Sequence, residues 1–319
     1  MGVGRRPVAA VVGDGGRPVP GHDPAAGPAE HHGVARSSME GRRVLVLGAT
    51  GLLGPYLVAE ARARGALVDG VGRRSGAVRH DLTASSDAMV RLNLASYDVV
   101  VNAVALTDVD ACEREPERAR AVNAGVVAEL VGGLARATHL VHVSTDQVYP
   151  DAPGPHREGV TGPVNAYGRS KLGGEIEACR HPRTTVVRTN FFGPSRTSGR
   201  ASLSDWALGA LARREPIDGF AGSWFSPLRL DTVARWCFDA VAAGATGTFN
   251  LGSRDGMSKY EFILALARAH RLDGSLVRAV EGGSRRGRAR RAPDLRLDVG
   301  AIEARLEGQL PTLAEEVAR

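Results

Sequence analysis

The sequence predicts an α/β fold, a doubly wound parallel sheet completed by a smaller mixed lobe at the C-terminal end. Between residues 42 and 188, short apolar runs rich in β-branched residues alternate with longer helical stretches. Parallel strands need such long crossover connections, which are right-handed and place helices on both faces of the sheet. After residue 188 this alternation ends. A composition of 43% hydrophobic and 24% charged residues is that of a globular chain and excludes wholesale disorder.

Five apolar runs predict the strands of the sheet. In chain order they are residues 44–47, 67–71, 98–103, 140–144 and 184–188. For the lobe we expect helices over 204–213, 231–243 and 258–270 and strands over 226–230 and 248–251. The sequence therefore predicts a sheet domain over residues 39–188 and a lobe over 189–319, some of whose strands can return to the sheet.

The first 38 residues differ from the rest of the chain, being rich in Gly, Pro, Ala and His without a helical or strand period. Such a segment has no apolar face to offset the entropy of ordering, so we predict a disordered tail. Met39 directly precedes the first strand and is our hypothesis for the natural start. A chain beginning at Met39 is expected to keep the activity and melting temperature of the full chain.

The cysteines and the charge of the chain indicate its cellular compartment and its classes of binding partner. Three separate cysteines without a CxxC pair are typical of a reduced, cytoplasmic protein, and no apolar run approaches the roughly 18 residues that a membrane span needs. The net charge of +6 comes mainly from arginines interleaved with acids, so we expect neither nucleic-acid binding nor a membrane partner. The dense run 285–291 makes Arg291 a weak candidate ligand for a phosphate group.

A glycine-rich turn follows the first strand and precedes a helical stretch. It reads Gly48-Ala49-Thr50-Gly51-Leu52-Leu53-Gly54. Glycines allow a tight turn and close approach of a pyrophosphate, and the helix N-terminus offers unpaired N–H groups to that anion. The pattern predicts a Rossmann-type dinucleotide-binding domain over 39–188, with cofactor contacts from Gly48, Thr50, Gly51, Leu52, Leu53 and Gly54.

The end of the second strand indicates which dinucleotide binds. If the strand ends at Gly72, its tip carries no acid and is followed by Arg73 and Arg74, whose guanidiniums can hold a 2′-phosphate. That register favours NADPH. In the competing register Asp69 binds the ribose hydroxyls and NADH is used. Asp81 and Leu82 are candidates for contacts to the adenine, although an Asp before a helix often serves only as its N-cap.

A tyrosine and a lysine four residues apart, Tyr167 and Lys171, open a predicted helix and share one of its faces. A neighbouring ammonium favours the phenolate, which we expect to lower the pKa of Tyr167 into a range useful for proton transfer. The same ammonium can hold the nicotinamide ribose, and Thr145 can orient a reacting carbonyl. Arg supplies 39 of the 41 basic side chains, so a Lys at this position indicates a role that a guanidinium cannot fill.

Together these motifs resemble the extended short-chain dehydrogenases/reductases. The motifs are Gly48-x-x-Gly51-x-x-Gly54, Asn102-Ala103-Val104-Ala105, Val122-Asn123-Ala124, Ser144-Thr145-Asp146-Gln147-Val148-Tyr149 and Tyr167-x-x-x-Lys171. Segments 109–116, 225–227 and 291–298 resemble, more narrowly, the dTDP-4-dehydrorhamnose reductases and their sugar-nucleotide relatives. The resemblance spans about residues 42 to 317.

The resemblance implies roles for matching positions. Tyr167 would be the proton donor, Lys171 its partner and ribose ligand, and Thr145 the hydroxyl that orients the carbonyl. Ala103, Val104 and Ala105 would line the cofactor. Thr145, Asp146 and Gln147 would face the sugar. The second lobe would hold the nucleotide diphosphate, and the candidates there are Asn190, Trp224 and Arg229, chosen because Arg neutralises phosphate and Trp offers a stacking face.

The implied reaction is hydride transfer from NADPH to the 4-keto carbon of a nucleotide-linked 6-deoxyhexose, in which the nucleotide is typically dTDP. NADH is the alternative hydride donor. Related dehydratases carry an acid where this chain has Gln147, and an amide cannot serve that step, so dehydration is disfavoured. Two alternatives stay open, an epimerase that retains NAD and a non-catalytic nucleotide-binding regulatory subunit. The family also leaves a homodimer open. No cluster of residues in the sequence calls for a metal.

Overall fold

The computed structural model describes residues 38–72, 78–79, 92–281 and 287–319. All of them belong to one compact unit that extends from Gly33 to Arg319. The predicted tail lies almost wholly outside the described residues, as do four of the predicted cofactor contacts. These are Arg73, Arg74, Asp81 and Leu82.

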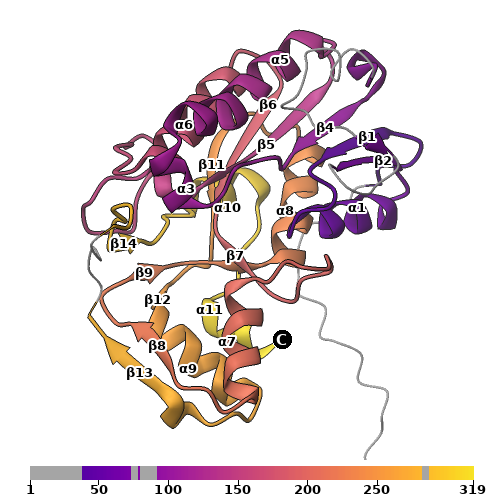
Figure 1. Ribbon diagram of the computed structural model, residues 1–319. Helices are drawn as coiled ribbons and strands as arrows, with labels where there is room; N and C mark the ends of the chain where they lie inside the picture. The colour runs from indigo at the N-terminus through magenta and orange to yellow at the C-terminus, as the bar shows by residue number, and fades with distance from the viewer. Residues whose placement is uncertain (1–37, 73–77, 80–91, 282–286) are drawn as a thin grey trace, which may run out of the picture. The chain divides into compact units, whose positions relative to one another are not determined.

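A seven-stranded parallel sheet forms the centre of the fold, in the strand order β11-β6-β5-β4-β1-β2-β3 (Figure 1). The strands are β1 (Arg43–Leu47), β2 (Leu67–Gly72), β3 (Val78–Arg79), β4 (Val99–Asn102), β5 (His139–Thr145), β6 (Thr184–Thr189) and β11 (Gly247–Leu251). The order reverses beside β1, and ligands of doubly wound sheets bind outside the carboxyl ends of the strands at such a point. The predicted fold class is confirmed.

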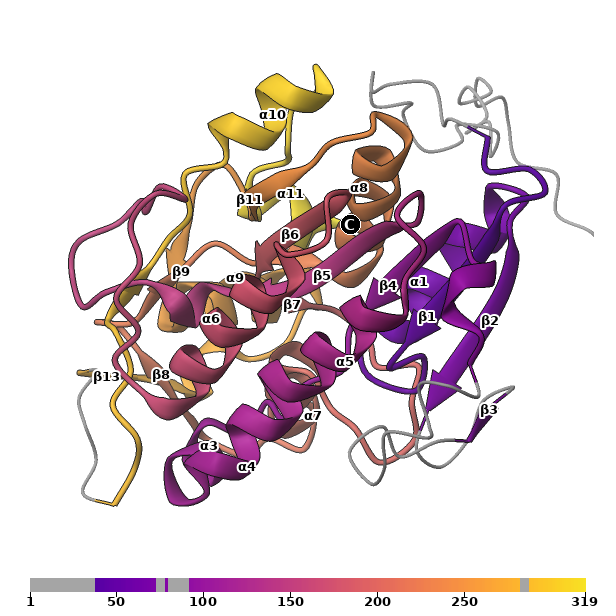
Figure 2. The ribbon, with the colours of Figure 1, turned by 90° about the horizontal axis from the view of Figure 1, so that it is seen from above.

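The helices cover both faces of this sheet (Figure 2). On one face lie α1 (Gly54–Ala63) and α8 (Leu230–Ala242), which contact each other. The other face is covered by α5 (Val126–Gly133) and α6 (Ala166–Ala178). Strand β1 shows why both faces are filled: Val44 and Val46 pack into one apolar core while Leu45 and Leu47 pack into the other, because successive side chains of a strand point to opposite sides.

Short elements connect the strands, and all of them except η1, which precedes β4, lie at the end of the sheet where the carboxyl ends of the strands are found. They are η1 (Leu94–Ser96), α3 (Val109–Arg114), α4 (Pro116–Arg120), the π-helical turn η2 (Ala121–Gly125) and η3 (Asp146–Val148). Helix α6 contacts α3, α4, η2 and η3, so it is held firmly beside β5.

The C-terminal part of the chain builds a third apolar core, drawn in the lower part of Figure 1. Besides α8, the helices of this part of the chain are α7 (Leu203–Ala212), α9 (Lys259–Ala269), η4 (Gly274–Leu276), α10 (Gly300–Leu306) and α11 (Leu313–Ala318). Of these, α10 packs through Ile302 and Leu306 into the core that holds Val44 and Val46. The short strands of this part are β7 (Phe191–Phe192), β8 (Ile217–Phe220), β9 (Trp224–Phe225), β10 (Leu228–Arg229), β12 (Met257–Ser258), β13 (Val277–Val280) and β14 (Asp294–Leu295). Because β11 and α8 pack with the large sheet, the chain after residue 188 contributes to both parts of the fold.

One predicted strand was wrong. The run 226–230 divides between two short strands and a helix, since β9 ends at Phe225, β10 covers Leu228–Arg229 and α8 begins at Leu230. Pro227 lies between the two strands, and a proline has no N–H with which to continue a ladder. Among the described residues, no helix is both long and apolar enough to cross a membrane.

Candidate active site

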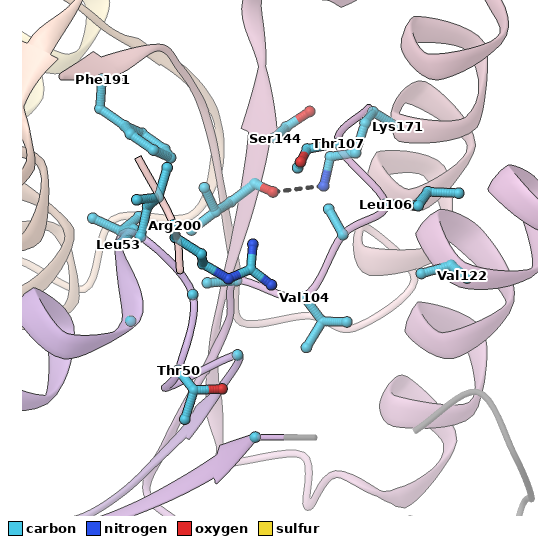
Figure 3. A pocket seen from close by; sticks show the side chains of 18 of the residues that line it. Thr50, Leu53, Val104, Leu106, Thr107, Val122, Ser144, Lys171, Phe191 and Arg200 are labelled. Atoms are coloured by element: carbon cyan, nitrogen blue, oxygen red, sulfur yellow. Dashed lines mark hydrogen bonds between the residues drawn. The ribbon is translucent and has the colours of Figure 1, made fainter. Parts of the chain in front are cut away.

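A pocket opens at the carboxyl ends of β1, β2, β4 and β5, between the glycine turn and helix α6 (Figure 3). Eleven of the predicted cofactor contacts line it. They are Gly48, Thr50, Gly51, Leu52, Leu53, Gly54, Ala103, Val104, Ala105, Tyr167 and Lys171. These residues, up to 123 positions apart in the sequence (Gly48 and Lys171), therefore line one pocket.

The glycine turn fits a phosphate group through its backbone. Gly48 has a φ of +84°, and a Cβ at this position would lie 2.8 Å from the carbonyl oxygen of Ala103, so only glycine brings β1 this close to the end of β4. Helix α1 starts at Gly54, and no side chain caps its N-terminus. Pro55 has no N–H, and the N–H groups of Tyr56 and Leu57 bond to the carbonyl oxygen of Leu53. The backbone N–H of Gly54 is the one that this end of the helix offers to an anion.

The tip of β2 carries no acid. The strand ends at Gly72, which lines the pocket together with Val71. Asp69 lies three residues earlier, and its carboxylate accepts a hydrogen bond of 2.8 Å from the hydroxyl of Tyr97. Burial, and then the Asp69 carboxylate, raises the pKa of the Tyr97 phenol. Asp69 is therefore engaged within the sheet and does not line the pocket.

Two buried asparagines fix the loop after β4. Asn102 accepts a hydrogen bond of 3.1 Å from the backbone N–H of Val104. Asn123 accepts one of 2.8 Å from the N–H of Leu106 and donates another of 2.8 Å to the hydroxyl of Ser170 on α6. These bonds connect the cofactor-facing loop to the helix that carries Tyr167.

Helix α6 places Tyr167 and Lys171 on one buried face. Asn165 caps the helix by accepting a hydrogen bond of 2.8 Å from the N–H of Gly168, as Asn does at many helix N-termini. Tyr167 is 8% exposed and Lys171 2% exposed. The Lys171 ammonium donates a hydrogen bond of 2.7 Å to the carbonyl oxygen of Val143, drawn as a dashed line in Figure 3.

The electrostatics of this pair correct our expectation. Burial raises the pKa of Tyr167 well above its ordinary value, and a hydrogen bond with Thr145 opposes this only in part. Burial also lowers the pKa of Lys171 to about 8, against the opposing influence of Glu175. The Asp146 carboxylate adds to the rise, and the Lys171 ammonium is not among the groups that shift the pKa of Tyr167, so the expected lowering of this pKa was wrong; burial is the main cause for both groups. Tyr167 is held as a protonated phenol, which is the form a proton donor needs.

Beside Tyr167, three further predicted residues form a chain of hydrogen bonds. The Thr145 hydroxyl donates to Asp146 Oδ1 over 3.1 Å, and Asn190 Nδ2 donates to Asp146 Oδ2 over 2.7 Å. Asp146 is 1% exposed, and burial raises its pKa while the bonds from Asn190 and Thr145 act against that rise. The structure therefore brings Thr145, Asp146 and Asn190 together next to the phenol.

The other predicted substrate residues have different surroundings. Gln147 accepts a hydrogen bond of 3.1 Å from Asn165 Nδ2, so its amide connects η3 to the cap of α6. Arg229 pairs with Asp231 at 3.2 Å. The ring of Trp224 lies 5.1 Å from the Arg296 guanidinium. None of the six predicted substrate residues, including Thr145, Asp146 and Asn190, is among the residues that line the pocket. Arg291, the weak phosphate candidate, pairs with Asp110 at 3.2 Å.

Two basic residues that we did not predict lie at the site. Lys259 begins α9, directly after the Ser258 capping box; burial lowers its pKa, and the Asp146 carboxylate opposes this. Lys259 and Lys171 are the two lysines among 41 basic residues, so the reasoning that singled out Lys171 applies equally to Lys259. Arg200 lines the pocket from the loop before α7, and no local motif announces it.

Comparison with protein families matches residues 42–319 to the family described as the RmlD substrate binding domain. The match covers all of the sheet and the C-terminal elements. It also begins where the first strand begins, so the predicted tail lies outside it.

Individual relatives agree with this match. The probable low-salt glycan biosynthesis reductase Agl14 of Haloferax volcanii is 30% identical over 286 residues, which are 86% of this chain and 95% of that protein. The dTDP-4-dehydrorhamnose reductase of Mycolicibacterium smegmatis is 40% identical over 167 residues, which are 51% of this chain and 49% of that protein. The crystal structure of dTDP-4-dehydrorhamnose reductase from Bacillus anthracis, in complex with NADP, has a TM-score of 0.75 and 21% identity, covering 87% of this chain and 97% of that chain.

Proposed function

The chain belongs to the family of the RmlD substrate binding domain, and from this premise we propose that it is a reductase that converts the 4-keto group of a nucleotide-linked 6-deoxyhexose to an alcohol with NADPH. The observation that carries the proposal is the meeting of two sites in one pocket. A backbone cradle suited to a dinucleotide and the buried Tyr167 and Lys171 pair line the same cavity. Relatives named as reductases of dTDP-linked sugars support the substrate class.

Different side chains transfer the proton and position the reactants. Bound NADPH would supply the hydride. Tyr167 donates its phenolic proton to the oxygen of the reacting carbonyl, and its raised pKa keeps that proton in place until the alkoxide forms. Thr145, hydrogen-bonded to Asp146, orients the carbonyl. Lys171, fixed by the Val143 carbonyl, holds the nicotinamide ribose and supplies positive charge beside the phenolate after transfer.

NADPH is favoured over NADH by the end of β2. An acid at the strand tip would bind ribose hydroxyls and repel a 2′-phosphate, but Gly72 occupies this place and Asp69 is bound by Tyr97. The next two residues in the sequence are Arg73 and Arg74. We therefore propose that these guanidiniums receive the 2′-phosphate.

For the substrate we propose that the sugar contacts Asp146 and Asn190 next to Tyr167. Lys259 lies within electrostatic reach of Asp146 and is a candidate ligand for the nucleotide diphosphate, in place of the paired Arg229. The homodimer that the family resemblance leaves open is not tested.

Turnover of a panel of dTDP-4-keto-6-deoxy sugars tests the proposal. We expect one NADPH to be oxidised for each alcohol formed, with the product identified by mass and NMR. An epimerase would instead interconvert substrate stereoisomers without consuming added NADPH and would retain NAD on purification. A regulatory subunit would bind nucleotide and turn over none of the sugars. Either result would overturn the reductase assignment.

A further inference from the structure

A segment of the C-terminal part of the chain, residues 194–200, is fastened to the dinucleotide end of the pocket. The Thr197 hydroxyl donates a hydrogen bond of 2.9 Å to the carbonyl oxygen of Gly51, in the glycine turn itself. Tyr56 of helix α1 donates another of 2.6 Å to the carbonyl oxygen of Pro194. The guanidinium of Arg196 lies 3.9 Å from the centre of the Tyr56 ring. The segment is thus attached to both the turn and the helix that would receive a pyrophosphate.

The local sequence of this segment directs one cation into the pocket. Gly199 has a φ of +71°, and the N–H of Arg200 donates to the carbonyl oxygen of Thr197 over 3.2 Å. A turn with positive φ at its third residue favours glycine there. The turn leaves the Arg200 side chain pointing into the cavity between Leu53 and Val104, above Thr50 (Figure 3).

The charge of the pocket suits an anion at this point. No carboxylate is found among the described residues that line it. Of its cations, Arg118 pairs with Glu115 at 2.9 Å and Lys171 is bound to the Val143 carbonyl. The Arg200 guanidinium makes neither a hydrogen bond nor an ion pair with any residue in the described part of the chain, and its neighbours are Thr50 and Leu53 of the glycine turn.

We propose that Arg200 binds the pyrophosphate of the dinucleotide, opposite the N-terminus of α1, and that residues 194–200 clamp the cofactor from the C-terminal part of the chain. This inference rests on the proposed function and adds a residue to its cofactor site. A guanidinium can hold two phosphate oxygens at once, while the backbone of the glycine turn approaches the pyrophosphate from the other side.

Direct binding measurements with NADPH, NADH and dTDP test this role, all at one salt concentration. Arg200→Gln should raise the Kd of NADPH and of NADH alike by about tenfold, the loss expected for one charge-assisted contact, and leave the Kd of dTDP unchanged. Arg213→Gln is the control, because it removes a charge paired with Glu215 at the far end of α7, outside residues 194–200 and the pocket wall, and it should leave all three unchanged. Thr197→Val, which removes the bond to Gly51, should weaken both dinucleotides by a smaller factor.

Three outcomes for Arg200→Gln would overturn the proposal. The first is an unchanged affinity for both dinucleotides. The second is a loss of affinity confined to NADPH, which would place Arg200 at the 2′-phosphate, and the third is a loss confined to dTDP, which would place it at the substrate. If Arg200→Gln binds normally while the wild type turns over NADPH, the clamp fails and the proposed function stands. If the wild type binds neither dinucleotide, both fail. Arg200 is exposed, so we expect an unchanged melting temperature, and Arg200→Lys should restore part of the affinity.

Discussion

The two ends of the site hold their ligands by different means. At the cofactor end, a short stretch around Gly48 and Gly54 offers backbone N–H groups and close approach, with few charges of its own. At the substrate end, Asp146 is held by Asn190 from 44 residues away and lies within reach of Lys259. Backbone dipoles do not titrate, whereas buried charges depend on pH and on every partner that stabilises them. The cofactor end should therefore tolerate changes of pH and of side chains that disable the substrate end.

The largest expected effect separates chemistry from cofactor binding. Tyr167→Phe removes the proton donor and little volume, so kcat should fall by about two to four orders of magnitude. The Kd of NADPH should stay nearly unchanged, because the glycine turn is intact. Steady-state kinetics and a binding titration measure the two quantities. Wild-type turnover in this variant would remove Tyr167 from the mechanism.

Lys171 serves both the cofactor end and the substrate end of the site, so its replacement should weaken cofactor binding and slow the reaction. Lys171→Arg keeps the charge, but a guanidinium cannot occupy the buried place in which Nζ bonds to the Val143 carbonyl. We expect a fall in kcat/KM of about a hundredfold or more together with weaker NADPH binding.

The pH dependence of the wild-type activity also tests the role of Lys171. With the pKa of Lys171 lowered to about 8, the ammonium is present below that pH and is lost above it, so activity should decline as the pH rises through about 8. Near-normal kinetics of Lys171→Arg would show that any cation serves at this position.

The preference between the two dinucleotides rests on charges outside the described residues. Replacing both Arg73 and Arg74 with Ala should weaken NADPH and leave NADH nearly unchanged, because NADH has no 2′-phosphate. Losing two charge-assisted contacts should shift the preference by roughly a hundredfold, and by less if the arginines are well solvated. Titrations with both nucleotides at one salt concentration measure it. If the wild type prefers NADH and the double variant does too, Asp69 is the residue that binds the ribose hydroxyls, and an NAD-retaining epimerase becomes the better account.

A smaller effect is expected at the substrate end. Asn190→Ala leaves Asp146 Oδ2 without its donor, so the KM of the sugar nucleotide should rise by about tenfold while the Kd of NADPH stays the same. Because the bond from Asn190 lowers the pKa of Asp146, its loss raises that pKa, and the acidic limb of the pH profile should move to higher pH. Arg229→Gln is the control, since Arg229 is paired with Asp231. An equal rise of KM in both variants would contradict this arrangement.

The sequence predicted most of what local patterns specify. The five strands predicted for the sheet domain lie within one residue of their predicted ends, because buried parallel strands are continuous apolar runs. The glycine turn and the Tyr167 and Lys171 pair line one pocket, as expected for a motif whose parts lie at strand ends. The strand over 226–230 failed because such short segments depend on distant partners: β9 pairs with β12 and β14, and β10 with β7.

Contacts between remote side chains could not be read from the sequence. Arg229 and Trp224 were chosen for their chemistry, but the partners that engage them, Asp231 and Arg296, are set by tertiary structure. Arg200 reaches the pocket from a segment that Thr197 connects to Gly51, 146 residues away in the sequence. The desolvation that raises the pKa of Tyr167 is equally a property of the folded surroundings. Lys259 was not predicted either, although the rarity of lysine in this chain could have indicated it.

The most direct test of the central claim follows the transferred hydride. NADPH carrying deuterium at the reactive position of its nicotinamide is incubated with the protein and a dTDP-4-keto-6-deoxy sugar, and the product is analysed by NMR. The account predicts one deuterium at C4 of the sugar, with one NADPH oxidised for each product molecule and with the reaction nearly abolished in Tyr167→Phe. A product that forms without deuterium, while the labelled NADPH is not consumed, would contradict it.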